Sequence, residues 1–263
     1  MIPKIIHFCW LSKNPYPAGI KRCMDSWKRH LPDYEFIHWN FDRFPRGKSK
    51  WVDQAFDAGK YAFAADYIRL YALYNYGGIY LDTDVEVVKP FGALLHLPYF
   101  IGKEDSQAEI AADTLGFEKG NSLMLDMLKS YEGQEFVNSD GSFNMEPLPC
   151  RIRRCIDERY HYNLIDKIEE FNCDSRVVNV FPVDWFRPMR FETHELHMTN
   201  NTYSIHRFAA SWWTPREWWV RWANEHFGYV GAGCVRFFWR PFPDIIKSFP
   251  STILRVGRRA FGS

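Results

Sequence analysis

The chain has 263 residues, enough for one well-buried core or for one domain with an appended lobe. Hydrophobic residues make up 46% and charged residues 25%, which is typical of a globular protein and excludes a disordered one. The formal net charge is +1, so the sequence has no overall basic field, and we expect no nucleic-acid partner.

Aromatic residues make up 18% of the chain, including 11 Trp, which suits a protein that stacks rings on sugars or bases. Most of these rings are nevertheless expected to fill the core. The six cysteines form no Cys-x-x-Cys and no metal-ligand spacing, which indicates reduced thiols. No signal-peptide pattern precedes the first strand-like run, and no apolar run reaches membrane-spanning length. We therefore expect a cytoplasmic protein.

The first 40 residues predict a parallel α/β unit. Residues 4–10 are apolar and β-prone, apolar positions recur at helical spacing from Ile20 to Leu31, and residues 34–39 indicate a second strand. A strand, a helix and a strand in this order predict a parallel pair with the helix as the crossover.

Further helices and strands are expected along the rest of the chain. Residues 61–76 are apolar nearly all round, which predicts a mostly buried helix with a left-handed cap at Gly77-Gly78. Three strands and an amphipathic helix are expected next, at 79–81, 85–88, 99–102 and 122–131. Two late strands and a last helix are expected at 176–181, 202–207 and 212–227, whereas 133–150 is rich in turn formers and predicts no element.

An acid-x-acid pair follows the predicted strand at 79–81. Asp82 and Asp84 are two residues apart, so both side chains would leave an extended chain on one side. They also fall at a strand's carboxyl end, where open α/β sheets bind ligands. Two such carboxylates can hold a divalent cation that also binds phosphate oxygens. Because the spacing continues to Glu86, a solvated polar strand face stays the alternative.

Two charges interrupt the apolar helix that precedes this pair. Asp66 and Arg69 are three residues apart and share a helix face. Charges on a buried face must be paired or must meet a ligand. They form a structural ion pair, hydrogen-bond sugar hydroxyls, or do both.

The run from Ile2 to Trp10 and the stretch from Asp66 to Asp84 resemble a known family. They are similar to the DXD-containing glycosyltransferases of family 32, which include bacterial capsule and polysaccharide transferases and yeast Och1-type mannosyltransferases. The same core resembles the glucosylating domain of large clostridial toxins. The resemblance implies the GT-A fold, an α/β fold with a Rossmann-like mixed sheet flanked by helices. It also implies retaining, metal-dependent hexosyl transfer.

The resemblance further implies the ligands. We expect Mn²⁺ or Mg²⁺ as the cofactor and a nucleotide sugar as the donor. The nucleotide is expected to be UDP, as in UDP-galactose, UDP-N-acetylhexosamine or UDP-glucose. The acceptor would be a hydroxyl of a lipid-linked or oligosaccharide glycan in polysaccharide biosynthesis. A non-catalytic carbohydrate-binding protein and a metal-dependent nucleotide-sugar phosphohydrolase are the alternatives.

Carried over residue by residue, the resemblance first implies how the donor is held. Trp10 matches the aromatic residue that stacks on the base, and Tyr80 matches a ring beside the nucleoside. Asp66 and Arg69 match the pair that grips the donor sugar. The departure from the family is Asp113, which lies in a segment where paired asparagines are common. Asp113 is expected to face the donor sugar or the acceptor, or to cap a turn.

The resemblance also implies the metal site. Asp82 matches the acid that contacts the ribose and the metal region, and Asp84 matches the direct ligand. His206 is similar to a late residue that completes the metal shell, and a neutral imidazole is a sound ligand for manganese. Ser211 and Trp212 match the Ser-Trp element that follows it, where Trp212 would close over the donor. The catalytic set is expected to be Asp66, Arg69, Asp82 and Asp84.

The expected transferase domain covers residues 1–234, with a donor-binding half over about 1–105 and an acceptor half over 106–234. The remaining tail, 235–263, alternates aromatic residues with cations and has Asp244 as its one acid. This mixture is typical of an interfacial anchor for anionic lipid. We therefore expect a helical tail that holds the protein peripherally on the inner face of the cytoplasmic membrane. A terminal helix packed on the domain is the alternative.

Overall fold

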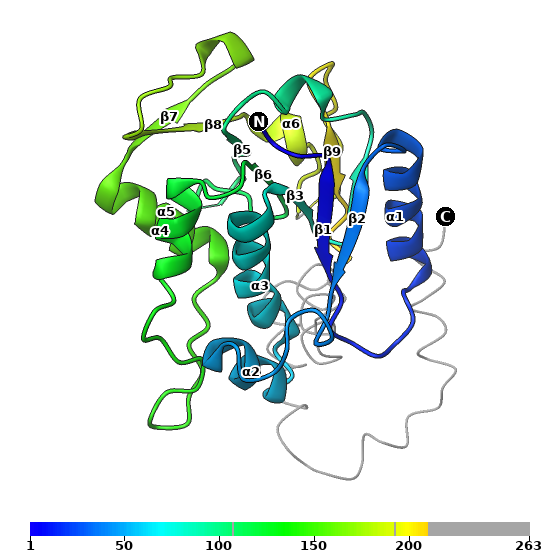
Figure 1. The fold of residues 1–263 in the computed structure, drawn as a ribbon. Coiled ribbons are helices and arrows are strands. Elements are labelled where there is room, and N and C mark those ends of the chain that lie inside the picture. Colours follow the sequence, from blue (N-terminus) through cyan, green and yellow to red (C-terminus); the bar gives the residue numbers. More distant parts are fainter. Residues whose placement is uncertain (107, 192, 210–263) are drawn as a thin grey trace, which may run out of the picture. The chain divides into compact units, whose positions relative to one another are not determined.

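The computed structural model describes residues 1–209, except 107 and 192. A five-stranded mixed sheet has the order β2-β1-β3-β6-β5 (Figure 1). Strand β1 is parallel to β2 and β3, whereas β6 is antiparallel to both β3 and β5. Their bounds are β1 (Ile5–Cys9), β2 (Glu35–Trp39), β3 (Gly78–Leu81), β5 (Tyr99–Ile101) and β6 (Thr114–Phe117).

Two smaller sheets and six α-helices complete the described part of the chain. The antiparallel pair is β4 (Val85–Val87) with β9 (Ser204–His206), and the parallel pair is β7 (His161–Leu164) with β8 (Val177–Val180). The helices are α1 (Ala18–His30), α2 (Lys50–Asp57), α3 (Tyr61–Tyr76), α4 (Ser122–Lys129), α5 (Leu148–Arg159) and α6 (Val183–Phe186). Two 3₁₀ turns lie at Gly92–Leu94 and Ile168–Glu170.

Alternate strand residues supply two hydrophobic cores on opposite faces of the main sheet. Ile6 and Phe8 of β1 pack in the same core as Trp27 of α1. Cys9 of β1 belongs to the other core, together with Leu73 of α3. In Figure 1, α1 and α3 accordingly lie on opposite sides of β1. This confirms the α/β class with a Rossmann-like mixed sheet flanked by helices, the arrangement expected of the GT-A fold.

The predicted elements within the described residues are all present, with ends shifted by at most two residues. The parallel pairing of the first two strands is also confirmed. The sequence did not predict α2, β6, β7, α5 or α6. The predicted helix at 212–227 and the tail at 235–263 lie outside the described residues. The described part forms one unit, Met1–Ala209, and the predicted boundaries near 105 and 234 stay predictions.

Gly77 ends α3 in a conformation that favours glycine strongly, with φ of 66° and ψ of −175°. The positive φ was expected, but the extended ψ differs from a left-handed helical cap, so that detail of the prediction is wrong. A Cβ on Gly77 would lie 2.6 Å from the backbone nitrogen of Lys119. The glycine therefore allows the chain to turn directly from α3 into β3.

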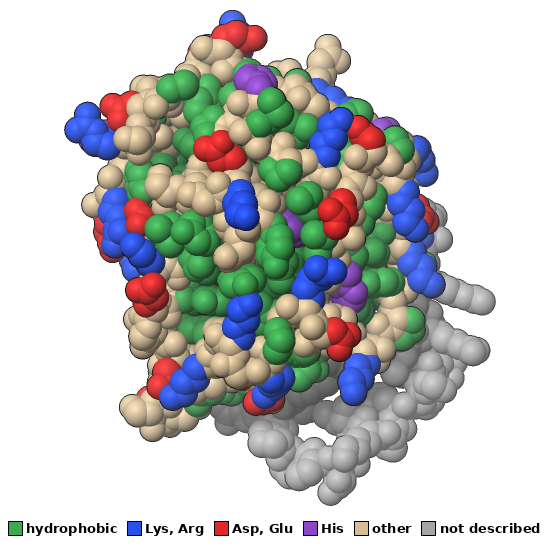
Figure 2. All heavy atoms as spheres, in the orientation of Figure 1, with side chains coloured by type: hydrophobic (Ala, Val, Ile, Leu, Met, Phe, Trp, Pro, Cys, Tyr) green, Lys and Arg blue, Asp and Glu red, His purple; other side chains and the backbone are tan. Residues whose placement is uncertain are grey.

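The surface agrees with the balanced composition. On the face shown in Figure 2, basic and acidic side chains are interspersed, and the described residues of that face form no continuous basic area.

The cysteines within the described residues are free thiols: Cys9, Cys23, Cys150, Cys155 and Cys173. Among the described helices, none is long and apolar enough to cross a membrane.

Candidate donor and metal site

Several residues that the sequence analysis singled out lie together at one end of the main sheet, where β1 and β3 finish and β6 begins. Trp10 follows the carboxyl end of β1, and Asp82 follows that of the parallel neighbour β3. Because β6 runs in the opposite direction, Asp113 precedes its start at the same edge. The backbone N–H of Asp82 donates to the carbonyl oxygen of Asp113 over 2.9 Å. The antiparallel strand thus joins two segments that are far apart in the sequence.

Asp82 and Asp84 converge through a turn. The backbone N–H of Val85 donates to the carbonyl oxygen of Asp82 over 2.9 Å, which closes the turn Asp82–Val85. The prediction that both carboxylates leave an extended chain is therefore wrong, because the extended strand ends at Leu81. The solvated-face alternative is excluded for Asp84, whose side chain is only 15% exposed and lies beside His206.

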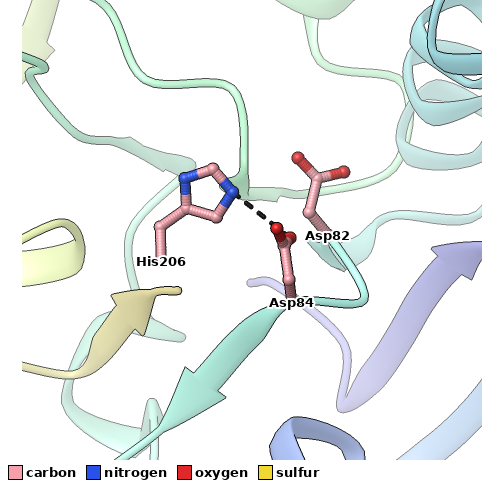
Figure 3. A group of neighbouring side chains, drawn as sticks. All are labelled: Asp82, Asp84 and His206. Atoms are coloured by element: carbon pink, nitrogen blue, oxygen red, sulfur yellow. Dashed lines mark ion pairs between the residues drawn. The ribbon is translucent and has the colours of Figure 1, made fainter. Parts of the chain in front are cut away.

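The structure brings His206 to the two aspartates, as predicted. Strand β9 pairs with β4 so that His206 lies opposite Val85. Ligand atoms of Asp82, Asp84 and His206 all lie within 4.8 Å of one another, and Figure 3 shows the His206 ring facing Asp84 with the Asp82 carboxylate beside them. His206 Nε2 lies 3.2 Å from Asp84 Oδ1, and among the described residues Nδ1 has no hydrogen-bond partner. The two carboxylates suit Mn²⁺ or Mg²⁺, and the imidazole favours Mn²⁺ of the two.

Burial and neighbouring charges shift the pKa values of the three side chains, Asp82, Asp84 and His206, in different directions. Burial lowers the pKa of His206, but the nearby Asp84 and Asp113 outweigh this effect and raise it overall. Burial raises the pKa of Asp84, but His206 and the N–H of Ala209 outweigh this effect and lower it. Burial raises the pKa of Asp82 to about 6 despite Arg69. The carboxylates therefore favour a positive charge at the position of His206, where a bound cation would also be stabilised.

Arg69 connects α3 to the acidic turn. Its guanidinium lies 3.3 Å from Asp66 and 2.9 Å from Asp82, and it donates to the carbonyl oxygen of Ala112. The side chain is only 6% exposed, so the predicted structural ion pair is present. Burial raises the pKa of Asp66 to about 6, an effect that Arg69 partly offsets. Contact of Asp66 and Arg69 with a donor sugar stays a prediction.

The two aromatic residues predicted to hold the nucleoside differ in exposure. Tyr80 is 1% exposed and lies under Arg69, whose guanidinium is 4.3 Å from the ring centre. In this structure Tyr80 therefore supports Arg69 from behind and does not line an open surface. Trp10 is half-buried, packs its ring against Tyr16 and donates from Nε1 to the carbonyl oxygen of Asn14. Stacking of Trp10 on a base stays a prediction.

Asp113 lies inside the site and does not cap a turn. Its side chain is 3% exposed, and burial raises its pKa although His206 lowers it. Sequence reasoning missed two of its neighbours, Arg187 and Glu104, which form an ion pair with each other. Two signals in the sequence could have found them, because Arg187 is a charge with apolar neighbours and Glu104 follows a predicted strand. The same two kinds of signal had pointed to Arg69 and Asp82. Ser211 and Trp212 lie outside the described residues.

Comparison with known proteins identifies part of the chain. Residues 17–105 match the family model described as a glycosyltransferase sugar-binding region containing the DXD motif. The matched segment includes Asp66, Arg69 and the Asp82–Asp84 turn. The predicted resemblance is confirmed for this DXD region, and Asp82-Thr83-Asp84 is its DXD motif.

Fungal proteins are similar over about half of this chain. Inositol phosphoceramide mannosyltransferase 3 of Schizosaccharomyces pombe is 32% identical over 136 residues, which cover 49% of this chain and 37% of the relative. Mannosyl phosphorylinositol ceramide synthase SUR1 of Saccharomyces cerevisiae is 31% identical over 137 residues, which cover 49% and 35%. The chain thus spans about a third of the length of the curated relatives that it matches.

A solved structure, PaToxG glycosyltransferase, is also similar. It is 25% identical, and the superposition has a TM-score of 0.46 and covers 60% of this chain and 68% of that one.

Proposed function

We propose that this protein is a metal-dependent, retaining glycosyltransferase that moves a hexose from a nucleotide sugar to a hydroxyl group. The observation that carries the proposal is the convergence of Asp82, Asp84 and His206 within 4.8 Å at the edge of a DXD sugar-binding region. His206 enters this group from far outside the matched segment. Chance clusters of exposed acids are common, but these three side chains are largely covered and one buried imidazole nitrogen lacks a partner among the described residues.

The cation would be held by Asp84 and His206, with Asp82 beside them. A bound Mn²⁺ or Mg²⁺ supplies charge that stabilises the departing diphosphate. The chain's own residues then fix the donor. Asp82 orients the ribose, Asp66 and Arg69 hold the sugar, and Trp10 stacks on the base.

The retaining course follows from the proposed membership of family 32. The acceptor hydroxyl attacks the face of the sugar from which the diphosphate leaves, so an α-linked donor gives an α-linked product. Among the described residues, the side chains paired with Asp82 and Asp84 are Arg69 and His206, which suit charge stabilisation. Stabilisation of the leaving group and positioning therefore supply the rate enhancement in this proposal.

For the donor we propose a UDP-sugar, with GDP-mannose as the second candidate because the two fungal relatives named above transfer mannose according to their names. Those names also give a lipid, inositol phosphoceramide, as the acceptor. A lipid-linked or oligosaccharide acceptor is therefore proposed here. The basic, aromatic tail at 235–263 would contact anionic lipid at the cytoplasmic membrane face.

The test measures sugar release and transfer in parallel. Purified protein is incubated with UDP-glucose, UDP-galactose, UDP-N-acetylglucosamine or GDP-mannose, with Mn²⁺ or with EDTA, and with or without a glycolipid acceptor. We expect one donor to be consumed only with metal and faster with acceptor. Metal-dependent hydrolysis that no acceptor accelerates would instead identify a phosphohydrolase. Glycan binding without any turnover, and without metal, would identify a carbohydrate-binding protein.

A further inference from the structure

Arg187 is a largely covered cation with no role in the proposed donor site. It follows α6 and is 17% exposed, with its guanidinium 5.0 Å from the ring centre of Phe208. Burial lowers the pKa of Arg187 to about 10, an effect that Asp82 and Asp84 partly offset. A guanidinium with this pKa stays charged at neutral pH. A positive charge is therefore fixed beside the acidic turn.

Buried polar contacts hold the backbone around Arg187 firmly. The hydroxyl of Ser204 in β9 lies 3.1 Å from the carbonyl oxygen of Phe186 and 3.2 Å from the hydroxyl oxygen of Thr114 in β6, so its single hydrogen is shared between these two acceptors. Thr114 and Ser204 are both fully buried. These contacts tie α6, β6 and β9 together directly under the site. The position of Arg187 relative to Asp113 is thus set by the fold and not by a free loop.

Arg187 lies between two carboxylates that differ in their other contacts. Its NH1 group forms an ion pair with Glu104 and lies 3.4 Å from Asp113 Oδ1. Oδ1 of Asp113 is buried and accepts no hydrogen bond from the described residues, whereas Oδ2 accepts one from the hydroxyl of Thr114 over 3.3 Å. An unsatisfied buried carboxylate oxygen normally costs stability unless a ligand completes it.

We propose that Arg187, anchored by Glu104, is a positioning residue that orients Asp113 to accept a hydroxyl hydrogen of the transferred hexose. This inference rests on the proposed function and adds a sugar-recognition subsite to it. The ligand class is a neutral hexose, because a carboxylate accepts hydrogen bonds from hydroxyl groups and repels an acidic sugar. In the proposed function the nucleoside diphosphate would be held at the metal, so the effect of Arg187 is assigned to the sugar and not to the nucleotide.

The experiment compares two ligands of the full-length protein in the presence of Mn²⁺. One is the nucleotide sugar consumed by the wild type among the four tested above, and the other is its nucleoside diphosphate, UDP or GDP. Affinity is measured calorimetrically for the wild type, Arg187→Met, Asp113→Asn and the double variant. Arg187→Lys tests rescue by charge, and Arg190→Met removes an exposed arginine of the same segment as the matched control.

We expect Arg187→Met and Asp113→Asn each to weaken nucleotide-sugar binding about tenfold, the size of one lost charge-assisted hydrogen bond. Nucleoside diphosphate affinity should stay within about twofold. The double variant should resemble the single ones, because both act through one contact. Arg187→Lys should recover part of the loss, and Arg190→Met should have no effect.

Three results would overturn this inference and leave the proposed function standing. The variants could lose affinity for the nucleotide sugar and for the nucleoside diphosphate equally, or the losses of affinity could add in the double variant. The third result is an unchanged affinity of Arg187→Met for the nucleotide sugar. A wild type that binds none of the four nucleotide sugars would overturn the proposed function as well. If Arg187→Met does not fold, Glu104→Gln releases the anchor and retains the cation. That variant should then show the same selective loss of nucleotide-sugar affinity.

Discussion

Two largely covered histidines of this protein, His7 and His206, have opposite surroundings. His7, in the centre of β1, is fully covered, with Nε2 2.7 Å from the carbonyl oxygen of Gly77 and Nδ1 3.1 Å from the indole nitrogen of Trp39. Both ring nitrogens therefore have partners. His206 has Asp84 on one side and a buried nitrogen without a partner among the described residues on the other.

The comparison shows that the groups which contact the ring nitrogens of a covered histidine indicate its role better than its degree of burial does. Burial lowers the pKa of His7 to about 4, so the ring is neutral and serves the fold. The carboxylates around His206 raise its pKa instead, and they leave a cluster that a cation would complete. His7 is thus structural, and His206 belongs to the proposed metal site.

The strongest test of this contrast removes the carboxylate beside His206. Asp84→Ala is expected to lower transfer on the order of 10³-fold, because a metal-held leaving group is worth several kcal/mol. The thermal shift caused by Mn²⁺ should disappear with it. Glu86→Ala, two residues further on, is the control and should keep both. Full activity of Asp84→Ala, or of the wild type in EDTA, would contradict the proposed metal site.

His7→Ala tests the structural side. We expect the free energy of unfolding to fall by about 3 kcal/mol, since the Trp39 N–H and the Gly77 carbonyl would both lose their partner in the core. Mn²⁺ affinity of the folded fraction should be unchanged. Denaturant titration and calorimetry measure the two quantities separately. A loss of metal affinity without a loss of stability would reverse the roles assigned to the two histidines.

The same histidine predicts a pH dependence. The unfolded chain takes up a proton at His7 below about 6.5, whereas the folded protein does so only below about 4, so this residue costs stability as the pH falls through that window. The stability of the wild type relative to His7→Gln should therefore decrease by up to about 3 kcal/mol from pH 7 to pH 4. Comparison with the variant cancels the opposite contributions of Asp66 and Asp82. A constant difference across the window would show that His7 does not titrate as described.

The smallest expected effect concerns His206 itself. His206→Ala should weaken Mn²⁺ binding at least about tenfold, since even a lost outer contact of a metal site costs 10- to 100-fold. In EDTA its free energy of unfolding should change less than that of His7→Ala. Isothermal titration with Mn²⁺ gives the first quantity and denaturant titration the second. Unchanged Mn²⁺ affinity would remove His206 from the site.

The sequence alone predicted the elements that have a clear pattern. The all-round apolar helix at 61–76, the glycine pair after it and the acidic pair that follows were found because periodicity and residue type coincide there. Strand β6 was missed because Thr114–Phe117 is too short for a pattern. Its Gly116 instead leaves room for the ring of Phe100, which a Cβ would meet at 2.1 Å. Helix α5 was missed because it starts in a segment rich in turn formers, although Pro149 in its first turn fits a helix start.

The residues of the candidate site also fall into a group that the sequence predicted and a group that it did not. Asp66, Arg69, Asp82 and Asp84 are close in sequence, so local reasoning and family resemblance together found them. The contact between Asp113 and Arg187 depends on the direction of β6 and on the buried contact between the hydroxyl groups of Thr114 and Ser204. Neither is encoded locally, because the two residues belong to segments that meet only in the folded sheet. Tertiary pairing decided which charges face one another.

The reversed direction of β6 has a consequence for how such a protein can diversify. The connection from β5 to β6, residues 102–113, leaves the sheet and re-enters it at the same edge. Insertions or exchanges there need not shift the register between β3 and β6 or move the Asp82–Asp84 turn. The sugar preference that we propose for Asp113, and the Glu104 anchor of Arg187, could therefore change while the proposed cation site stays constant. One short connection would let a single scaffold give rise to transferases for many sugars.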